Sequence, residues 1–453
     1  MQINLKDKKF YSTMIGIAIP IALQNLISSS LNMVDTVMIG RLGEKEIAAV
    51  GLANQVFFLF ILLLFGINSG CAIFTAQFWG KRDILSIRKV LGIALLSGTI
   101  ISLFFSSAAF FIPQVLLRFF TQDKAVILLG SEYLKIVSFS YFVTAISFSY
   151  GFASRSIGQA KLPMVVSGIS LLFNTGLNYL LIFGRFGFNP LGIRGAALAT
   201  LIARSIELLI MLMLIYRNGD VLAGKLKEML NFNRKFAKTL YRTAMPVILN
   251  EGIWSLGMIM YMAAYGRLGT ESIAAVQIAN TVQNIFMVVA MGLGNSCAVM
   301  LGNEIGAGHK ENAINYGNAF IALGISCGLL VGILLAILAP FILSFFKVSS
   351  IVHDSAYKLL LIMGISLTFK FFNTVLIVGI LRSGGDTKFS LFLEMGSVWL
   401  FGVPVAFLGV MLWKLPVHWA YALISIEELV KSFIGLPRII SRKWVRNVVE
   451  NMQ

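Results

Sequence analysis

Charged residues are scarce in this sequence, at 13% of its 453 positions, against about 25% in an ordinary soluble domain. So few charges cannot cover the surface of a soluble protein of this length, which excludes that class. Cysteine and histidine are also rare, with three of each. Because no CxxC spacing and no histidine cluster occur, we expect neither disulfides nor a histidine–cysteine metal centre.

The motifs of common enzyme classes are missing as well. The sequence holds no HExxH, no GxSxG and no phosphate-binding GxxxxGK[ST] loop. We therefore expect no enzyme activity, no ATP hydrolysis and no organic cofactor. An integral-membrane enzyme stays as the less favoured alternative. Asp386, in a Gly-rich RSGGDT stretch, is interpreted as part of a turn that ends a helix.

Long apolar runs dominate what is present, since 58% of the residues are hydrophobic. Runs of this length can cross a hydrocarbon layer of ~30 Å. Spanning backbone must satisfy its own hydrogen bonds, so the prediction is an all-α integral membrane protein. The predicted spans lie near 14–39, 47–77, 89–111, 131–154, 163–184, 194–216, 242–265, 273–304, 314–341, 355–381, 389–410 and 417–437.

The positive charges indicate the orientation. The net charge is +17, and the Lys and Arg residues lie between the apolar runs, which argues against nucleic acid as a partner. With a cytoplasmic N-terminus, 23 of them fall in cytoplasmic segments and 10 in the opposite loops. This bias predicts a multi-pass protein of the plasma (inner) membrane with both termini cytoplasmic.

An internal repeat divides the chain. The stretch GRLGEKEIAAVGLAN, from Gly40, matches GRLGTESIAAVQIAN, from Gly266, at an offset of 226 residues. With one inserted residue, SRSIGQAK (154–161) matches LRSGGDTK (381–388). We predict six-helix halves at 1–216 and 242–453, joined by a cytoplasmic linker at 217–241. Six helices per unit imply a pseudo-two-fold axis along the membrane normal.

Polar residues inside the first half mark a candidate ion site, because charge inside a span is costly. In the first span Asn25, Ser28, Asn32 and Asp35 share one helical face. Two amides of the fifth span, four residues apart, can approach the carboxylate. The predicted ion-coupling residues are Asp35, Asn32, Asn174 and Asn178. A buried structural acid is the alternative for Asp35.

The repeat maps this stripe onto the seventh span, where a carboxylate stands among large polarizable side chains. Such surfaces suit bulky organic cations, although these side chains can equally pack between helices. Together with a polar stripe on the eighth span, the predicted substrate-binding residues are Glu251, Trp254, Met258, Tyr261, Asn280, Asn284 and Met287. Further polar residues of the second half are Lys370 and Asn373, and Lys370 is expected to pair with Glu251 or Glu394 or to snorkel.

Charged residues elsewhere in the spans are interpreted as structural sets. Arg204 and Glu207 lie three residues apart, the spacing of an ion pair on one helix. The twelfth span carries a similar group, formed by Glu427, Glu428 and Lys431.

Several stretches together resemble one family of membrane transporters. They are Pro20, NMVDTVMIGRLG (32–43), IAAVG (47–51), Asn174, GAALAT (195–200) and LRSGGD (381–386). As a set they are similar to the bacterial multidrug and toxic compound extrusion (MATE) family, over residues 10–440. The resemblance implies a V-shaped secondary active antiporter of twelve helices, which expels organic solutes as Na⁺ or H⁺ enters.

The same resemblance implies roles for single residues. Asp35 stands at the family's coupling carboxylate on helix 1, and Asn174 at a polar position of helix 5 near it. Relatives commonly have Asp four residues after the latter, where this chain has Asn178. Several branches place the helix 7 acid eight residues after a proline, whereas Glu251 is five after Pro246. A bound Na⁺ is left open at Asp35 only.

Other transport classes stay as alternatives. Flippases for lipid-linked saccharides share the half-repeat, but twelve spans and acidic stripes disfavour them. A major-facilitator carrier is disfavoured because the loop WGKRDILSIRK (79–89) lacks that class's Gly-Asp-Arg-type motif. The expected partners are a small organic solute, H⁺ or Na⁺ and the lipid bilayer, and the expected state is a monomer.

Overall fold

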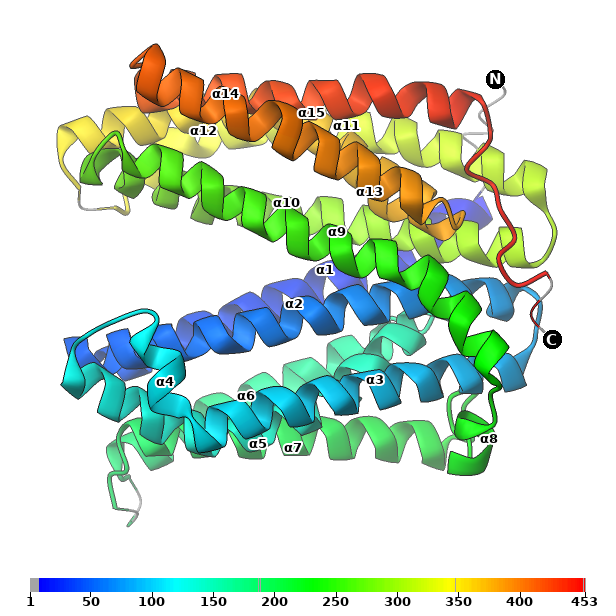
Figure 1. The fold of residues 1–453 in the computed structure, drawn as a ribbon, viewed down its shortest axis with the longest axis horizontal. Helices are drawn as coiled ribbons and strands as arrows, with labels where there is room; N and C mark the ends of the chain where they lie inside the picture. The colour runs from blue at the N-terminus through cyan, green and yellow to red at the C-terminus, as the bar shows by residue number, and fades with distance from the viewer. Residues whose placement is uncertain (1–7, 186, 188, 347, 451, 453) are drawn as a thin grey trace. The chain divides into compact units, whose positions relative to one another are not determined.

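The computed structural model describes residues 8–185, 187, 189–346, 348–450 and 452. In this part of the chain the regular structure is entirely helical (Figure 1). The helices are α1 (Lys8–Gly40), α2 (Glu44–Gly80), α3 (Ile84–Phe111), α4 (Pro113–Arg118), α5 (Lys124–Ser156), α6 (Lys161–Phe183), α7 (Ile193–Arg217), α8 (Leu226–Leu230), α9 (Arg234–Gly266), α10 (Thr270–Gly306), α11 (Lys310–Leu343), α12 (Ser350–Thr374), η1 (Val375–Leu381), α13 (Thr387–Gly396), η2 (Ser397–Gly402), α14 (Val403–Phe407), η3 (Leu408–Leu412) and α15 (Val417–Ile440).

Length and composition qualify 11 helices of the described part as membrane spans, with α12–η1 and α13–η3 each counted as one continuous span. The remaining predicted span is α15, which folds as a helix of 24 residues but carries Glu427, Glu428 and Lys431 near its centre. The predicted all-α membrane fold is therefore confirmed. Helices extend beyond the predicted spans: α9 begins at Arg234, before the predicted start near residue 242, and α5 begins at Lys124, before the predicted start near residue 131.

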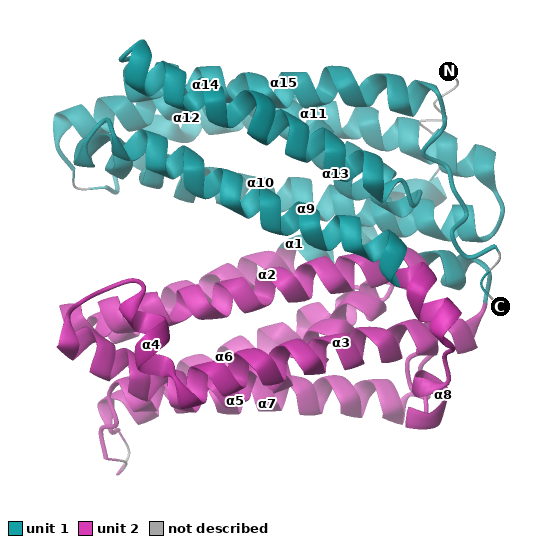
Figure 2. Cartoon of the chain, viewed as in Figure 1, with its two compact units in different colours: residues 1–22, 76–82, 241–453 teal, residues 23–75, 83–240 magenta. Residues whose placement is uncertain are grey.

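The chain divides into two compact units (Figure 2). Unit 1 consists of Met1–Ala22, Ala76–Arg82 and Tyr241–Gln453, and unit 2 of Leu23–Thr75 and Asp83–Leu240. Helices α1, α2 and α9 thus each contribute to both units. The predicted division into halves at 1–216 and 242–453 stays a prediction.

Unit 2 is built around the neighbouring pairs α3–α5, α5–α7 and α6–α7. Its core includes Phe60 of α2 and Tyr141 of α5, whose rings stack with centroids 5.0 Å apart. The short helix α8 packs on α3, where Arg88 bonds Glu228 at 2.9 Å. The backbone N–H of Lys225, aided by that arginine, holds the pKa of Glu228 below its usual range.

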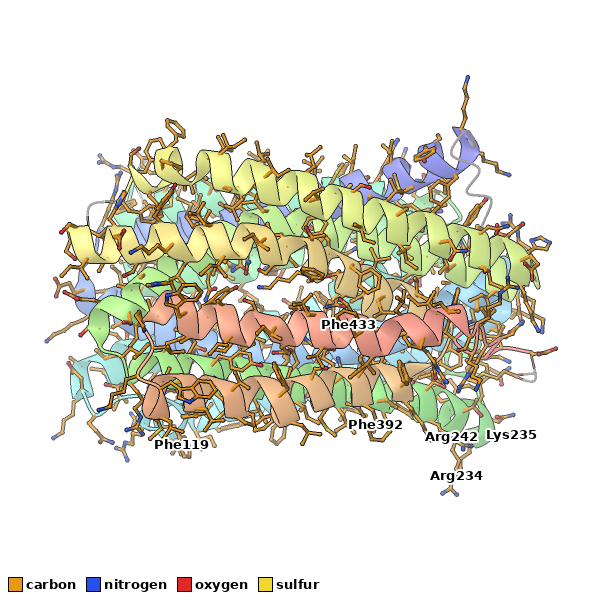
Figure 3. All side chains as sticks on the ribbon, turned by 90° about the horizontal axis from the view of Figure 1, so that it is seen from above. Phe119, Arg234, Lys235, Arg242, Phe392 and Phe433 are labelled. Carbon is orange, nitrogen blue, oxygen red and sulfur yellow. The ribbon has the colours of Figure 1, made fainter. Side chains whose placement is uncertain are left out.

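Unit 1 is built around the neighbouring pairs α11–α12, α10–α12 and α12–α15. Its lateral surface is apolar. Phe392 of α13 and Phe433 of α15, for example, are 65% and 75% exposed (Figure 3). The charged Arg242 of this unit lies instead near the start of α9, as do Arg234 and Lys235 of unit 2 (Figure 3). Apolar walls with charge at the helix ends are what a bilayer requires.

The residues after α15 pack onto the end of α2. Gln77 is fully buried, and its side-chain oxygen accepts a hydrogen bond from the Val448 amide at 2.8 Å. Its side-chain nitrogen donates to the carbonyls of Ser383, at 2.8 Å, and Arg446, at 3.1 Å. Trp444 is buried beside them, with 1% of its surface exposed. One glutamine therefore ties the end of α2 to the C-terminal segment inside unit 1.

The ends of α2 and α10 meet through two glycines that the repeat relates, Gly80 and Gly306. A Cβ at Gly80 would overlap the Asn303 carbonyl, so we expect Gly80→Ala to destabilise the protein by about 1–3 kcal/mol through overpacking. Gly51→Ala, in open space on the same helix, should be neutral or stabilising. Thermal unfolding in detergent compares the two, and equal midpoints would contradict the expected contact.

Candidate functional site

The predicted carboxylate and two predicted amides form one cluster in unit 2. The side-chain nitrogen of Asn178 donates to Oδ1 of Asp35 at 2.5 Å and to Oδ1 of Asn174 at 3.0 Å. Both asparagines lie on α6 and are only 1% exposed, whereas Asp35 of α1 is half-buried. The spacing of four residues places the two amides on one face of α6, turned toward α1.

This cluster has unused hydrogen-bonding capacity. Oδ1 of Asn178 and Nδ2 of Asn174 are buried without a hydrogen-bond partner. Because unmade bonds of buried polar groups are costly, such atoms are suited to a ligand that arrives and leaves. Among the described residues no ion pair involves Asp35, and its side-chain hydrogen bond comes from the amide of Asn178. The predicted neighbour Asn32 is exposed and has no side-chain bond to the cluster.

A polar chain crosses the interior of unit 2 over four helices. Arg155 of α5 donates to Gln24 of α1 at 2.8 Å, and Gln24 donates to Ser167 of α6 at 3.1 Å. Ser167 in turn donates to Glu207 of α7, also at 3.1 Å. Glu207 pairs with Arg204 at 2.9 Å, as predicted from their spacing. This chain connects Arg155 to the Arg204–Glu207 ion pair and includes no direct contact with Asp35.

The second predicted stripe, on α9, is divided between an ion pair and the core. Glu251 pairs with Arg382 at 2.7 Å, so it is not a free carboxylate. Trp254 and Met258 pack against the apolar core of unit 1. Tyr261 is buried and donates to Glu427. For the three large side chains, the structure thus shows the packing alternative, while their predicted role toward a substrate stays a prediction.

On α10 the residue that points into the polar interior was not among the predicted ones. Asn284 is exposed, Asn280 is half-buried, and Met287 packs against the core. Gln283 is buried instead, and its side-chain oxygen accepts a hydrogen bond from Lys370 at 2.8 Å. Its spacing does not stand out in the sequence, because it lies off the stripe of asparagines.

Lys370 finds different partners from those expected. It donates to Gln283 and to the hydroxyl of Tyr421, at 3.1 Å, and it has no direct contact with Glu251 or Glu394. The expected pairing with either acid is therefore wrong. The reason is that Glu251 forms an ion pair with Arg382, whereas the hydroxyl of Tyr421 on α15 lies within hydrogen-bond distance of Lys370.

The charges near the centre of α15 form the structural set that their spacing indicated. Lys431 pairs with Glu427 at 2.5 Å and lies 3.5 Å from Glu428. Asn373 of α12 donates to a carboxylate oxygen of Glu428 at 2.6 Å. Lys431 is 3% exposed, so this is a charge network buried within unit 1.

No metal centre of the usual kind emerges. Across the residues that the structure describes, no group of three or more His, Cys, Asp or Glu side chains can hold a metal ion.

Asp386, interpreted as part of a turn, precedes α13 and pairs with Arg438 at 2.6 Å and Arg446 at 3.1 Å.

Comparison with known proteins identifies the family of this chain. The MatE family model matches residues 20–180 and 246–408, two blocks that each begin at the proline of a repeat. The chain therefore belongs to the MatE family, the multidrug and toxic compound extrusion transporters. It is a multi-pass membrane protein of that efflux family, as the resemblance in its sequence indicated.

Curated relatives and solved structures align with almost the whole length of this chain. A probable multidrug resistance protein NorM of Thermotoga maritima is 24% identical, over 96% of this chain and 93% of its own. The uncharacterized transporter YisQ of Bacillus subtilis is also 24% identical, over 97% and 96%. The Vibrio cholerae MATE transporter VcmN, solved as a D35N mutant, has the same fold at 18% identity, with a TM-score of 0.87 over 96% and 98% of the chains.

Proposed function

We propose that this chain is a secondary active antiporter, which exports organic cations in exchange for H⁺ or Na⁺ by alternating access. The observation that carries the proposal is the contact of Asp35 with Asn178, beside buried amide atoms that have no partner. The proposal includes a monomer in the plasma membrane with both termini cytoplasmic, and it includes no enzymatic step.

The coupling follows from what neutralisation does to this cluster. A charged Asp35 accepts a strong, charge-assisted hydrogen bond from Asn178. A bound proton or Na⁺ removes the negative charge, which weakens this bond and the hold of α6 on α1. The side-chain oxygen of Asn178 has no hydrogen-bond partner in the structure. It can accept a hydrogen bond from a protonated Asp35 or serve as a ligand for Na⁺. The ion thereby favours one conformation over the other, as coupling requires.

The cationic nature of the cargo follows from the same carboxylate. Arg204 is committed to Glu207, and Arg382 to Glu251. Asp35 has no direct cationic partner in the part of the chain that the structure describes. A cationic solute and the coupling ion would then be attracted by one negative charge. Competition of this kind converts the entry of the ion into release of the cargo.

The experiment is dye efflux from proteoliposomes that contain the purified protein, with proton and Na⁺ gradients imposed separately. Efflux of a cationic dye under one gradient, and not the other, is expected and identifies the coupling ion. No dye movement under either gradient would contradict the proposal. Transbilayer movement of a fluorescent lipid-linked saccharide in the same liposomes would instead favour the flippase alternative.

A further inference from the structure

The repeat relates two polar pairs, one in each unit. In unit 2, Gln24 of α1 donates to Ser167 of α6. The offset of 226 residues relates Gln24 to Asn250, and the offset of 227 that matches Lys161 with Lys388 relates Ser167 to Glu394. Asn250 of α9 indeed donates to Glu394 of α13 in unit 1. The same contact is thus built twice, with a carboxyl group where the first copy has a hydroxyl.

The charges inside unit 1 leave this carboxyl group without a direct cation. Glu251 is paired with Arg382 at 2.7 Å. Lys431 lies at 2.5 Å from Glu427 and 3.5 Å from Glu428.

The third cation of this interior, Lys370, contacts neutral oxygens of Gln283 and Tyr421 and lies within electrostatic range of Glu428. Four carboxyl groups therefore face three cations, and Glu394 is the acid without an ion pair among the described residues. Glu394 lies within a membrane-spanning helix, where an uncompensated negative charge is costly.

An unsatisfied atom lies beside the same carboxyl group. Asn250 is only 3% exposed, and its side-chain oxygen has no hydrogen-bond partner. Its side-chain nitrogen already donates to Oε2 of Glu394. A primary amide and a protonated carboxyl group form two parallel hydrogen bonds, N–H to O and O–H to O. A proton on Glu394 therefore supplies the missing donor to Asn250 and removes the extra charge.

We propose that Glu394, held by Asn250, is a second proton-binding site of this transporter, located in unit 1 and separate from Asp35. The bound species is a proton and not a metal cation, because Lys431 and Arg382 already provide positive charge within electrostatic range of Glu394. The charged groups around the site are Glu251, Arg382, Glu427, Glu428, Lys431 and Lys370.

The site is assembled from separate helices, which gives it a way to release the proton. Asn250 comes from α9, Glu394 from α13 and Lys431 from α15. A shift of α9 relative to α13 breaks the amide contact, and closer approach of Lys431 stabilises the ionised carboxylate. The coupling of this release to export rests on the proposed antiport, whereas the protonation itself does not.

Infrared spectroscopy of the purified wild-type protein tests the protonation directly. A protonated carboxyl group has a C=O stretch that a carboxylate lacks and that shifts in D₂O. We expect this band in the wild type, its loss in Glu394→Gln, and its retention in Asp35→Asn. Glu132→Gln is the matched control, because Glu132 is ion-paired with Arg194 at 2.9 Å and should contribute no such band.

Two further variants allow the proposal to be tested even if one mutant fails to fold. Glu394→Ser installs the side chain of the repeat-related Ser167 and should also lose the band. Asn250→Leu keeps the acid but removes its partner, so the band should move to higher frequency. An unchanged band in both Glu394 variants would overturn the proposal. Because no gradient or cargo is used, absence of dye efflux would contradict the antiport and leave this result standing.

Discussion

Asp35→Asn is expected to abolish gradient-driven efflux while leaving the protein folded, with a weaker affinity for a cationic dye that no longer depends on the coupling ion. Asn is nearly isosteric with Asp, and its side-chain oxygen can still accept the hydrogen bond from Asn178, but it cannot change charge. Coupling between two ligands is typically 5- to 150-fold in affinity, on the order of 1–3 kcal/mol. The ratio of dye affinities with and without the coupling ion should therefore fall to about one in the mutant.

The measurement combines dye efflux from proteoliposomes with equilibrium dye binding in detergent at varied pH and Na⁺. Asp354→Asn serves as the control, since Asp354 is an exposed acid that pairs with Lys358, one turn further along the same helix, at 2.6 Å. This control should retain both coupling and binding. Ion-dependent affinity that survives in Asp35→Asn would show that the coupling carboxylate lies elsewhere.

Lys431→Met should destabilise the protein by about 3–5 kcal/mol, the usual cost of breaking a buried ion pair by removing one partner. The loss is large because Lys431, which is 3% exposed, contacts both Glu427 and Glu428. The double variant Glu427→Gln with Lys431→Met also removes the charge of the carboxylate nearest to Lys431 and should recover much of the loss.

Thermal unfolding in detergent, followed by tryptophan fluorescence, measures these differences. Lys358→Met is the matched control, because Lys358 also pairs with an acid four residues away but is 46% exposed. An exposed pair contributes only about 0–1 kcal/mol. Equal losses in the two lysine variants would mean that Lys431 is solvated in the membrane-embedded protein and not buried as described.

The candidate ion site could be anticipated because its signals are local. Asp35 is a charge within an apolar run, and two asparagines four residues apart share one helical face. The ion pairs of Arg204 with Glu207 and of Lys431 with Glu427 were also predictable, since each lies within one helix. Spacing along a single helix is enough for such contacts.

Contacts between helices could not be predicted in the same way. Lys370 was expected near Glu251 or Glu394 but contacts Gln283 and Tyr421. Such contacts depend on how each helix is rotated about its axis. In α12 that rotation changes along the chain, because the helix continues as the π-helical segment η1 (Val375–Leu381), which precedes Arg382. A π-helical turn alters the 3.6-residue phase. The helical face on which Arg382 lies therefore cannot be extrapolated from Lys370.

The sequence by itself determined the membrane class, the helical spans and the repeat, because hydropathy and the need to satisfy backbone hydrogen bonds act on each segment alone. It also determined the family, through residues that recur at fixed spacing. Only the tertiary structure decided which charges are compensated. It assigned Arg382 to Glu251 and left Glu394 with an amide. The physical reason is that compensation depends on distances between side chains of different helices, which no pattern along one helix contains.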